Sequence, residues 1–240
     1  MKNIPNLLTS LNLASGFIAL VFAANGQLVT ASWFILAAMI FDFSDGFAAR
    51  LLKAYSDIGR ELDSLADLVS FGVAPAFIVY RLITQTFAEG TELRIFDKIP
   101  GSVALITAVM PVCAAIRLAV FNLDTTQKTS FKGLPTPANA LAVITVVIAS
   151  GLADQPLLKW FTGSPSALII YLLLLSALMV TRLPLLSLKF SSLQLRGNES
   201  RYVLVGLVII LFLTIGIASA PLIIPVYIIV SLVSVYISKA

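Results

Sequence analysis

The sequence predicts an all-α integral membrane protein that forms one domain of about eight transmembrane helices. Of the 240 residues, 59% are hydrophobic and only 12% are charged, against about 25% charged in an average soluble domain. The mean hydropathy is +0.99, which is typical of membrane proteins. Apolar runs of membrane-spanning length, about 20 residues each, follow one another along the chain. We therefore assign residues 1–240 to a single membrane-embedded domain.

Eight apolar runs are separated by stretches of turn-forming residues, such as Asn25-Gly26, Pro100-Gly101 and Gly197-Asn198. The fifth and the last run are close to the lower limit for a transmembrane helix, about 17 residues. The break between the last two runs depends on Ser219 to Pro221. The predicted spans are residues 4–25, 28–50, 62–87, 101–121, 136–152, 166–182, 202–218 and 221–238.

The first run, residues 4–25, is predicted to be an uncleaved span. A signal peptide is the alternative, but only Lys2 supplies positive charge before it, and polar residues interrupt the apolar stretch. Three of these, Asn6, Thr9 and Asn12, recur every three residues and so share one helical face. This face either forms hydrogen bonds between packed helices or turns toward a group of acidic residues further along the chain.

The distribution of Lys and Arg predicts the orientation in the membrane. With the N-terminus in the cytoplasm, twelve of these residues lie inside and four outside, as the positive-inside rule requires. Trp33 and Trp160 then lie near the outer interface, where tryptophan is enriched. Both termini are therefore expected in the cytoplasm. The inside residues are Lys2, Arg50, Lys53, Arg60, Arg117, Lys128, Lys132, Arg182, Lys189, Arg196, Arg201 and Lys239, and the outside residues are Arg81, Arg94, Lys98 and Lys159.

Residues 183–200 differ from the spans in composition. Leucines alternate there with polar residues that include Lys189 and Arg196, while Pro184 and several serines argue against a transmembrane helix. We predict that this segment lies at the cytoplasmic membrane interface.

The composition excludes several kinds of chemistry. The chain has no histidine and one cysteine, Cys113, which excludes a histidine general base, a Ser-His-Asp triad, a His/Cys zinc site and disulfide bonds. Cys113 lies in an apolar run and is predicted to pack as a small hydrophobic residue. The net charge of +4 does not indicate a nucleic-acid partner, because the basic residues are spread over loops between apolar runs. A bound metal must therefore be a hard ion with oxygen ligands.

Four aspartates gather within residues 42–67 of this mostly apolar chain. Asp42 and Asp45 are three residues apart near the end of the second span, and Asp63 and Asp67 are four apart near the start of the third. Each pair therefore shares one helical face, and the short turn between the helices brings the pairs together. Carboxylates this close need a cation. The sequence predicts one or two Mg²⁺ or Mn²⁺ ions.

The residues around the aspartates favour a diphosphate site. Gly46 and Gly59 leave room for a ligand, and Arg50 offers a planar guanidinium to phosphate oxygens. Metal and arginine would stabilise a leaving phosphate while one carboxylate activates an acceptor. Three alternatives stay open: an ion-pair network in which Arg50, Lys53 and Arg60 neutralise the acids, a relay or carrier site of a transporter, and an aspartate-rich membrane prenyltransferase.

The spacing D-x2-D-G-x2-A-R-x8-G-x3-D-x3-D over residues 42–67 resembles the signature of the CDP-alcohol phosphatidyltransferases, without a departure. This resemblance implies a membrane enzyme, expected as a homodimer, that moves a phosphatidyl group from a CDP-linked lipid to an alcohol and releases CMP. It implies metal binding by Asp42, Asp45, Asp63 and Asp67, with Asp67 also the base toward the acceptor, and Arg50 on the diphosphate. The expected CDP-lipid site comprises Thr9, Asn12, Asp42, Gly46, Ala49, Arg50 and Gly59.

The acceptor alcohol must be predicted from the rest of the chain. Residues 4–16, the block 117–138 and the run 178–189 resemble the serine-using branch of this family from bacteria and archaea, although Val120 stands where arginine is common. This implies CDP-diacylglycerol and L-serine as substrates at a prokaryotic cytoplasmic membrane. Serine is a zwitterion, so its pocket needs a cation and an ammonium acceptor. The expected pocket residues are Arg117, Asn122, Lys128, Lys132 and Thr136. Glycerol 3-phosphate, inositol phosphate and choline stay open as alternative acceptors.

Overall fold

The computed structural model describes residues 3–88, 100–124, 130–186 and 198–237, and most of these are helical. The prediction of an all-α membrane protein is confirmed for this part of the chain, with one antiparallel strand pair that the sequence did not indicate. The elements are α1 (Ile4–Ala24), α2 (Leu28–Leu51), α3 (Asp57–Asp67), η1 (Leu68–Val73), α4 (Ala74–Ala88), α5 (Pro100–Thr107), α6 (Val109–Leu123), β1 (Ser130–Lys132), α7 (Thr136–Leu152), α8 (Pro156–Thr162), α9 (Pro165–Val180), β2 (Pro184–Leu186), α10 (Glu199–Ile215), η2 (Gly216–Leu222) and α11 (Ile223–Ile237).

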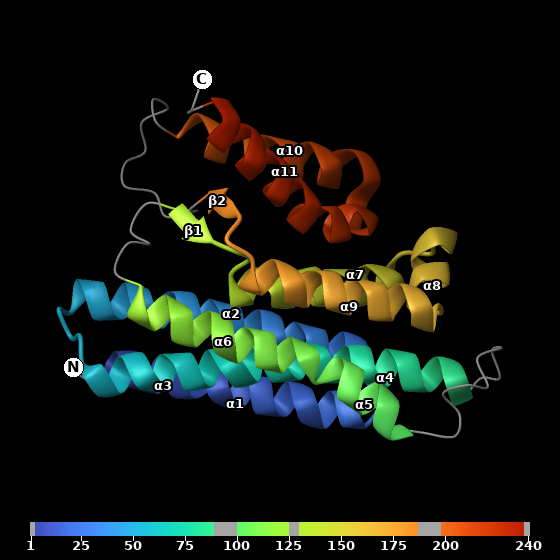
Figure 1. Cartoon of the computed structure of the whole chain (residues 1–240), viewed down its shortest axis with the longest axis horizontal. Helices are drawn as coiled ribbons and strands as arrows, with labels where there is room; N and C mark the ends of the chain where they lie inside the picture. The colour runs from blue at the N-terminus through green and yellow to red at the C-terminus, as the bar shows by residue number, and fades with distance from the viewer. Residues whose placement is uncertain (1–2, 89–99, 125–129, 187–197, 238–240) are drawn as a thin grey trace.

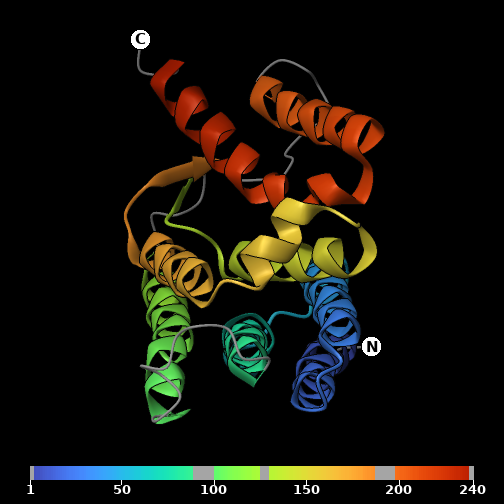
Figure 2. The same ribbon diagram turned by 90° about the vertical axis from the view of Figure 1, so that its right-hand side faces the viewer.

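The long helices run side by side in layers (Figure 1). One layer holds the α1–α2 hairpin, the α3–η1–α4 helix and the α5–α6 helix, and α7 and α9 cover one side of it (Figure 2). The hairpin of α10 and α11 lies beyond α7 and α9. Helix α7 is the most deeply buried, because it packs against α2 on one side and against η1 on another.

The number of spans differs from the prediction. Within the described residues, five helical stretches are long and apolar enough to cross a membrane, and the pair α8 and α9, bent by 80°, would make six. Helix α7 has 17 residues and is shorter than this criterion. The five stretches are Ile4–Ala24, Leu28–Leu51, Asp57–Thr86, Gly101–Leu123 and Glu199–Tyr236. The count of eight therefore stays a prediction.

The stretch Glu199–Tyr236 is a helical hairpin. Ser200 near its start donates a hydrogen bond to Ser234 near its end, with 2.8 Å between the hydroxyl oxygens. The chain reverses at η2, which starts at Gly216 with a φ of 71° and contains Pro221. Positive φ favours glycine, and proline interrupts an α-helix. The reversal thus includes the Ser219 to Pro221 break read from the sequence.

The helix α3–η1–α4 contains a widened π turn directly after Asp67. At this turn the helix approaches α1 closely, since a Cβ on Gly16 would lie only 2.8 Å from the Cα of Ser70. Ser70 donates a hydrogen bond to the carbonyl of Asn12 on α1, and Asn139 of α7 donates to the carbonyl of Phe71. Three helices are therefore tied together one turn beyond Asp67.

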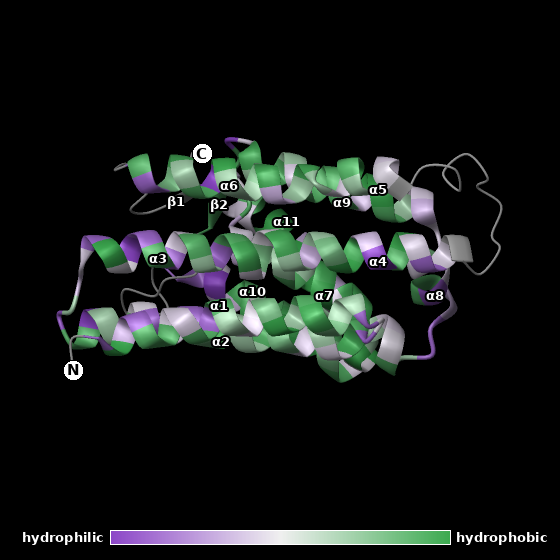
Figure 3. Cartoon of the chain, turned by 90° about the horizontal axis from the view of Figure 1, so that it is seen from below, coloured by the Kyte–Doolittle hydropathy of each residue, from purple (hydrophilic) through white to green (hydrophobic). Residues whose placement is uncertain are grey.

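The surface is that of an integral membrane protein. Large hydrophobic side chains such as Phe17, Ile40, Leu105, Ile170 and Leu213 point outward from the helices. Figure 3 shows apolar residues over the middle of the bundle and a concentration of hydrophilic residues along α3. A soluble protein would bury such apolar surface, whereas a lipid bilayer covers it.

The predicted interfacial segment 183–200 is only partly described. Its residues 184–186 form strand β2, which pairs with β1 so that Lys132 lies opposite Pro184. Residues 187–197, including Lys189 and Arg196, lie outside the described part of the chain. An interfacial location for them stays a prediction.

Candidate active site

Helices α2 and α3 bring the four aspartates to one end of the bundle. Asp42 and Asp45 lie on the last turns of α2, and Asp63 and Asp67 lie on α3. The chain turns between them over five residues, and the side chain of Ser56 caps α3 by accepting a hydrogen bond from the backbone nitrogen of Gly59 at 3.0 Å. This cap fixes where α3 starts.

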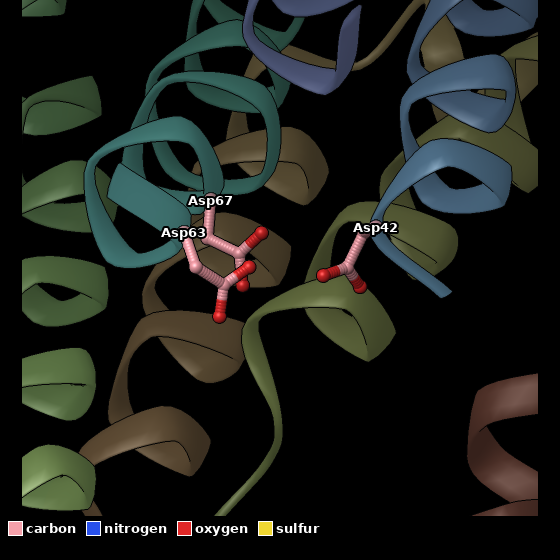
Figure 4. A group of neighbouring side chains, drawn as sticks. All are labelled: Asp42, Asp63 and Asp67. Carbon is pink, nitrogen blue, oxygen red and sulfur yellow. The ribbon is translucent and has the colours of Figure 1, made fainter. Parts of the chain in front are cut away.

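Three of the four carboxylates meet. One carboxylate oxygen from each of Asp42, Asp63 and Asp67 lies within 4.8 Å of the other two. Figure 4 shows Asp63 and Asp67 projecting from α3 toward Asp42 on α2. Asp67 is buried, with 8% of its surface exposed. We call these three residues the aspartate trio.

Asp45 lies next to the trio but has a different partner. Its Oδ2 accepts a hydrogen bond from the hydroxyl of Thr9 on α1 at 2.6 Å. Its charge still acts on Asp63 and Asp67. All four aspartates were predicted to gather. In the structure three of them converge, and Asp45 lies beside these three.

The polar face of α1 points at this site. Asn12 is fully buried and donates a hydrogen bond to Oδ1 of Asp67, with 3.1 Å between the two atoms. Thr9 binds Asp45, and Asn6 lines the adjoining cavity. Both interpretations of this face therefore hold, because its hydrogen bonds between packed helices are made to the aspartates themselves.

A cavity of about 520 Å³ opens beside the trio. It lies between the start of α1, the end of α2 and the start of α3, and its lining includes Thr9, Asp45, Gly46, Ala49 and Gly59. Four of the residues predicted for a CDP-lipid site, Thr9, Gly46, Ala49 and Gly59, therefore border one space. Asp42 belongs to the aspartate trio beside this space, and Asn12 donates a hydrogen bond to Asp67 of the trio. The exposed Arg50 follows Ala49 on the last turn of α2.

The two glycines of this cavity have different surroundings. At Gly46 an added Cβ would meet no atom within 4 Å, so the position faces open space. At Gly59 a Cβ would lie 2.9 Å from Oγ of Ser56 and 3.0 Å from Oδ1 of Asn6. Room for a ligand explains Gly46, whereas Gly59 permits the first turn of α3 to pack closely against α1.

The cavity also includes residues that sequence reasoning did not assign to a site. Tyr55, Ser56 and Arg60 line it from the turn and from the first turn of α3. Arg60 forms ion pairs with Asp57 and Glu61, at 4.0 and 3.6 Å, and not with the trio. The proposed neutralising network therefore lacks Arg60. Their closeness to Gly59 in the sequence was the one signal that could have placed them at this cavity.

The residues present fit a hard divalent cation. The trio supplies only carboxylate oxygens, the ligands that Mg²⁺ and Mn²⁺ prefer. Oδ1 of Asp63 and Oδ1 of Asn12 are buried and have no hydrogen-bond partner among the described residues. Buried acceptors without a donor are rare in proteins, and a cation would satisfy them. Asp63 and Asp67 form no ion pair within the described part of the chain.

The residues expected to bind serine lie on α6, on β1 and at the start of α7. Arg117 is buried on α6, and Asn122 donates a hydrogen bond to Ser64 on α3 at 2.8 Å. Lys132 on β1 pairs with Asp124, with 2.9 Å between nitrogen and oxygen. Thr136 begins α7, whose first turns lie beside the trio (Figure 4), as the packing of α7 on α2 and η1 requires. Lys128 lies outside the described residues.

Comparison with known proteins identifies the family. The sequence model described as CDP-alcohol phosphatidyltransferase matches residues 2–182. The chain belongs to this family. The match includes all four aspartates and every residue that lines the cavity, and it ends before the α10–α11 hairpin.

Similar proteins carry more specific names. A CDP-diacylglycerol–serine O-phosphatidyltransferase of Helicobacter pylori (strain J99) is 37% identical over 147 residues, which cover 60% of this chain and 56% of that protein. A protein of the same name from Bacillus subtilis is 35% identical over 183 residues, covering 76% and 89%. An archaetidylserine synthase of Methanothermobacter thermautotrophicus is 32% identical over 142 residues, covering 58% and 55%. The chain thus spans little more than half the length of the H. pylori relative.

Proposed function

We propose that this protein transfers the phosphatidyl group of CDP-diacylglycerol to L-serine and releases CMP. The observation that carries the proposal is the convergence of Asp42, Asp63 and Asp67 at the inner end of the cavity between α1, α2 and α3. Serine as the acceptor is supported by the names of the H. pylori and B. subtilis relatives. The roles below are part of this proposal.

The CDP group of the substrate would occupy the cavity. Gly46 leaves its wall open, Ala49 adds only a methyl group, and Arg50 lies one turn beyond Gly46 on α2, where its guanidinium can bind diphosphate oxygens. Phe43 and Phe47, on the same turns of α2, are exposed on the outer surface. This apolar surface beside the cavity suits the acyl chains, which stay in the bilayer.

Asp67 is proposed as the general base. Asn12 holds its carboxylate by donating to Oδ1, so the other oxygen is available to the serine hydroxyl. Asp67 accepts the hydroxyl proton while the serine oxygen forms a bond to the phosphatidyl phosphorus. The bond from this phosphorus to the CMP oxygen breaks, and CMP leaves with the electron pair. A positioned base of this kind contributes about 10²–10⁴-fold to the rate.

A divalent cation held by Asp42, Asp63 and Asp67, with Asp45 beside them, would neutralise the charge that develops on the diphosphate. Arg50 would add a second positive charge from the α2 side of the cavity. Thr9 keeps Asp45 in place through the 2.6 Å hydrogen bond. The serine carboxylate would be bound by Arg117, a buried cation, with Asn122, Lys132 and Thr136 nearby and Lys128 expected to contribute.

We further propose eight spans with both termini and the site on the cytoplasmic side of a prokaryotic cytoplasmic membrane. The distribution of the 16 Lys and Arg residues supports this orientation. A homodimer, implied by the family resemblance, is part of the same proposal, and the mass of the purified protein in detergent tests it.

A panel of acceptors tests the proposed reaction. The purified protein is incubated with CDP-diacylglycerol, Mg²⁺ or Mn²⁺, and one of L-serine, glycerol 3-phosphate, inositol phosphate or choline, and CMP release is followed. We expect CMP and phosphatidylserine in equal amounts with serine alone, and loss of both after chelation of the metal. CMP release with another alcohol but not with serine would refute the serine assignment. No CMP with any alcohol would refute the transferase itself.

A further inference from the structure

Asp124 ends helix α6 and is held in place by a neighbouring element. Its Oδ2 accepts a charge-assisted hydrogen bond from Nζ of Lys132 at 2.9 Å, and its side chain is 19% exposed. Lys132 belongs to β1, which is paired with β2. Asp124 is therefore a mostly buried carboxylate in a defined position. A carboxylate has about four lone-pair sites, so Asp124 can accept hydrogen bonds from several donors at once.

Arg117 lies on the same face of α6 as Asp124. The two residues are seven positions apart, about two helical turns, and the charge of Asp124 acts on the guanidinium of Arg117. Arg117 is 6% exposed, and its Nε has no hydrogen-bond partner among the described residues. Its Cζ lies 5.3 Å from the ring centroid of Phe121, which comes between the two charged residues on this face. A buried guanidinium with an unused donor needs an anion or acceptor.

Protein packs over Arg117 on this face of α6, whereas Phe121 on the same face is exposed. Tyr227 of α11 is 4% exposed, and the charge of Arg117 acts on it. Its hydroxyl donates a hydrogen bond to the carbonyl of Leu186 on β2 at 2.9 Å. The adjacent Leu185 is 1% exposed. Helix α11 and the strand pair therefore lie next to the region that contains Arg117 and Asp124, while the side chain of Lys132 stays half-exposed.

The same end of α6 is hydrogen-bonded to α3, the helix that carries Asp63 and Asp67. Asn122 donates a hydrogen bond to Oγ of Ser64 at 2.8 Å, and Ser64 directly follows Asp63 of the trio. Asn122 lies two residues before Asp124. A small acceptor molecule bound along this end of α6 is thus next to α3, where the proposed base Asp67 is located.

We propose that Asp124 binds the ammonium group of the amino-acid acceptor, while Arg117 and Lys132 bind its carboxylate. This inference rests on the proposed transfer to serine and assigns what distinguishes serine from a simple alcohol. The buried guanidinium of Arg117 is complementary to the carboxylate of a zwitterion, and Asp124, held in place by Lys132, is complementary to its ammonium. An acceptor that lacks the ammonium gives up the hydrogen bond to Asp124, and one that lacks the carboxylate gives up its contact with Arg117. A site built to hydrogen-bond a substrate group rejects analogues without that group.

The test uses acceptors that each lack one charge. L-Serine, 3-hydroxypropanoate (no ammonium) and ethanolamine (no carboxylate) are compared by CMP release from CDP-diacylglycerol, for the wild type and for Asp124→Asn. We expect the KM for serine to rise about tenfold or more, because a charged hydrogen-bond partner is lost. The KM for CDP-diacylglycerol should not change. The preference for serine over 3-hydroxypropanoate should fall by a similar factor, whereas the preference for serine over ethanolamine should fall much less.

Asp154→Asn is the matched control. Asp154 also pairs with a lysine, Lys159, but it lies in the turn between α7 and α8, at the opposite end of the bundle from α3 (Figure 1). This variant should keep the wild-type preference. A serine KM within twofold of wild type for Asp124→Asn, or an unchanged preference over 3-hydroxypropanoate, would overturn the assignment of Asp124.

Asp124→Glu keeps the negative charge, and it tests the proposed contact with the ammonium group if Asp124→Asn does not fold. Retention of the preference for serine over 3-hydroxypropanoate in this variant supports the role of the carboxylate, and its loss contradicts it. A wild-type protein that releases no CMP with serine would instead refute the proposed function. The two failures are therefore distinguishable.

Discussion

The four aspartates of the site share one chemistry but have different surroundings. Asp45 accepts a hydrogen bond from Thr9, and Asp67 accepts one from Asn12. Oδ1 of Asp63 is buried without a partner in the described part of the chain. At the residue scale these surroundings suggest different tasks: an oriented base at Asp67 and a site for positive charge at Asp63.

Asp67→Asn is expected to remove turnover without removing nucleotide binding. The amide cannot accept the serine proton, so kcat should fall by about 10²–10⁴-fold. Asparagine has nearly the same size as aspartate, so the cavity stays intact. CMP release gives kcat, and equilibrium binding of CDP gives the nucleotide affinity.

Glu61→Gln is the control on the same helix. Glu61 is exposed and pairs with Arg60 and not with the trio in the described part of the chain, so its loss should leave both quantities unchanged. Wild-type turnover in Asp67→Asn would exclude the proposed base.

Gly46→Leu is expected to block the CDP-lipid without harming the fold. A Cβ at this position would meet no protein atom within 4 Å, and the rest of the leucine side chain would extend into the cavity that Gly46 lines. The KM for CDP-diacylglycerol should rise about tenfold or more, since a ligand that must avoid overlap loses binding. Thermal stability should stay constant or rise slightly, because leucine favours a helix over glycine.

Gly206→Leu provides the comparison for Gly46→Leu. Gly206 lies on α10 and also has no atom within 4 Å of an added Cβ, but it does not line the cavity. It should leave the KM unchanged. Equal effects of the two substitutions would mean that the cavity is not the CDP-lipid site.

Much of the site could be predicted from residue spacing, and the rest could not. The i, i+3 and i, i+4 spacings place each aspartate pair on one face, and the short turn brings the helices together. Which three carboxylates converge depends on Thr9, whose contact with Asp45 spans 36 positions in the sequence. The tight contact at Gly59 likewise depends on Asn6 of another helix. Contacts of this kind arise from packing and leave no local pattern.

At the scale of elements, the π turn and the strand pair could not be predicted from the sequence either, because both depend on residues far away in the chain. The π turn at Leu68–Val73 is stabilised by Asn139 of α7, which binds the carbonyl of Phe71. Strands β1 and β2 have three residues each and lie more than 50 residues apart in the chain. The apolar runs predicted the helices well because hydropathy is a local property. Short strands and widened turns depend on distant partners.

Tyr227→Phe tests whether α11 supports the acceptor region. The substitution removes the 2.9 Å hydrogen bond to the carbonyl of Leu186, which should cost about 1 kcal/mol of stability. Because Tyr227 links α11 to β2 beside Arg117, the KM for serine should rise while the KM for CDP-diacylglycerol stays constant. Steady-state kinetics with each substrate varied measures both.

Tyr171→Phe is closely matched to this variant. Tyr171 of α9 also donates a 2.9 Å hydrogen bond to a backbone carbonyl, that of Ala142 on α7. Its removal should lower stability by a similar amount and leave the KM for serine unchanged. If both variants change the serine KM equally, the effect is general loosening of the bundle and α11 has no special role.

At the scale of the whole molecule, charge and apolar surface together define the membrane arrangement. Apolar side chains cover the outside of the helices, and the turn that leads into α3 lies at the opposite end of the bundle from α8 (Figure 1). Composition alone predicted this class. The number of spans could not be fixed by hydropathy, because a short buried helix such as α7 and a bent pair such as α8 and α9 have the same composition as full spans.

Cysteine labelling tests the orientation. Cys113 is first replaced by serine, and a single cysteine is placed at Asp57 or at Asp154, both of which are highly exposed. An impermeant maleimide added to intact cells should label Asp154→Cys at once, and should label Asp57→Cys only after the cells are opened. The reverse labelling pattern would show that the end of the bundle with the site faces outward, contrary to the proposed topology.

The central claim is that the aspartate trio and the adjoining cavity form one metal and CDP site. The most direct measurement is an anomalous difference map from crystals grown with CDP and Mn²⁺. We predict a Mn²⁺ peak between the carboxylates of Asp42, Asp63 and Asp67, with the CDP phosphates next to it in the cavity beside Gly46. CDP bound with no Mn²⁺ peak at the trio, or with the peak elsewhere, would contradict the claim.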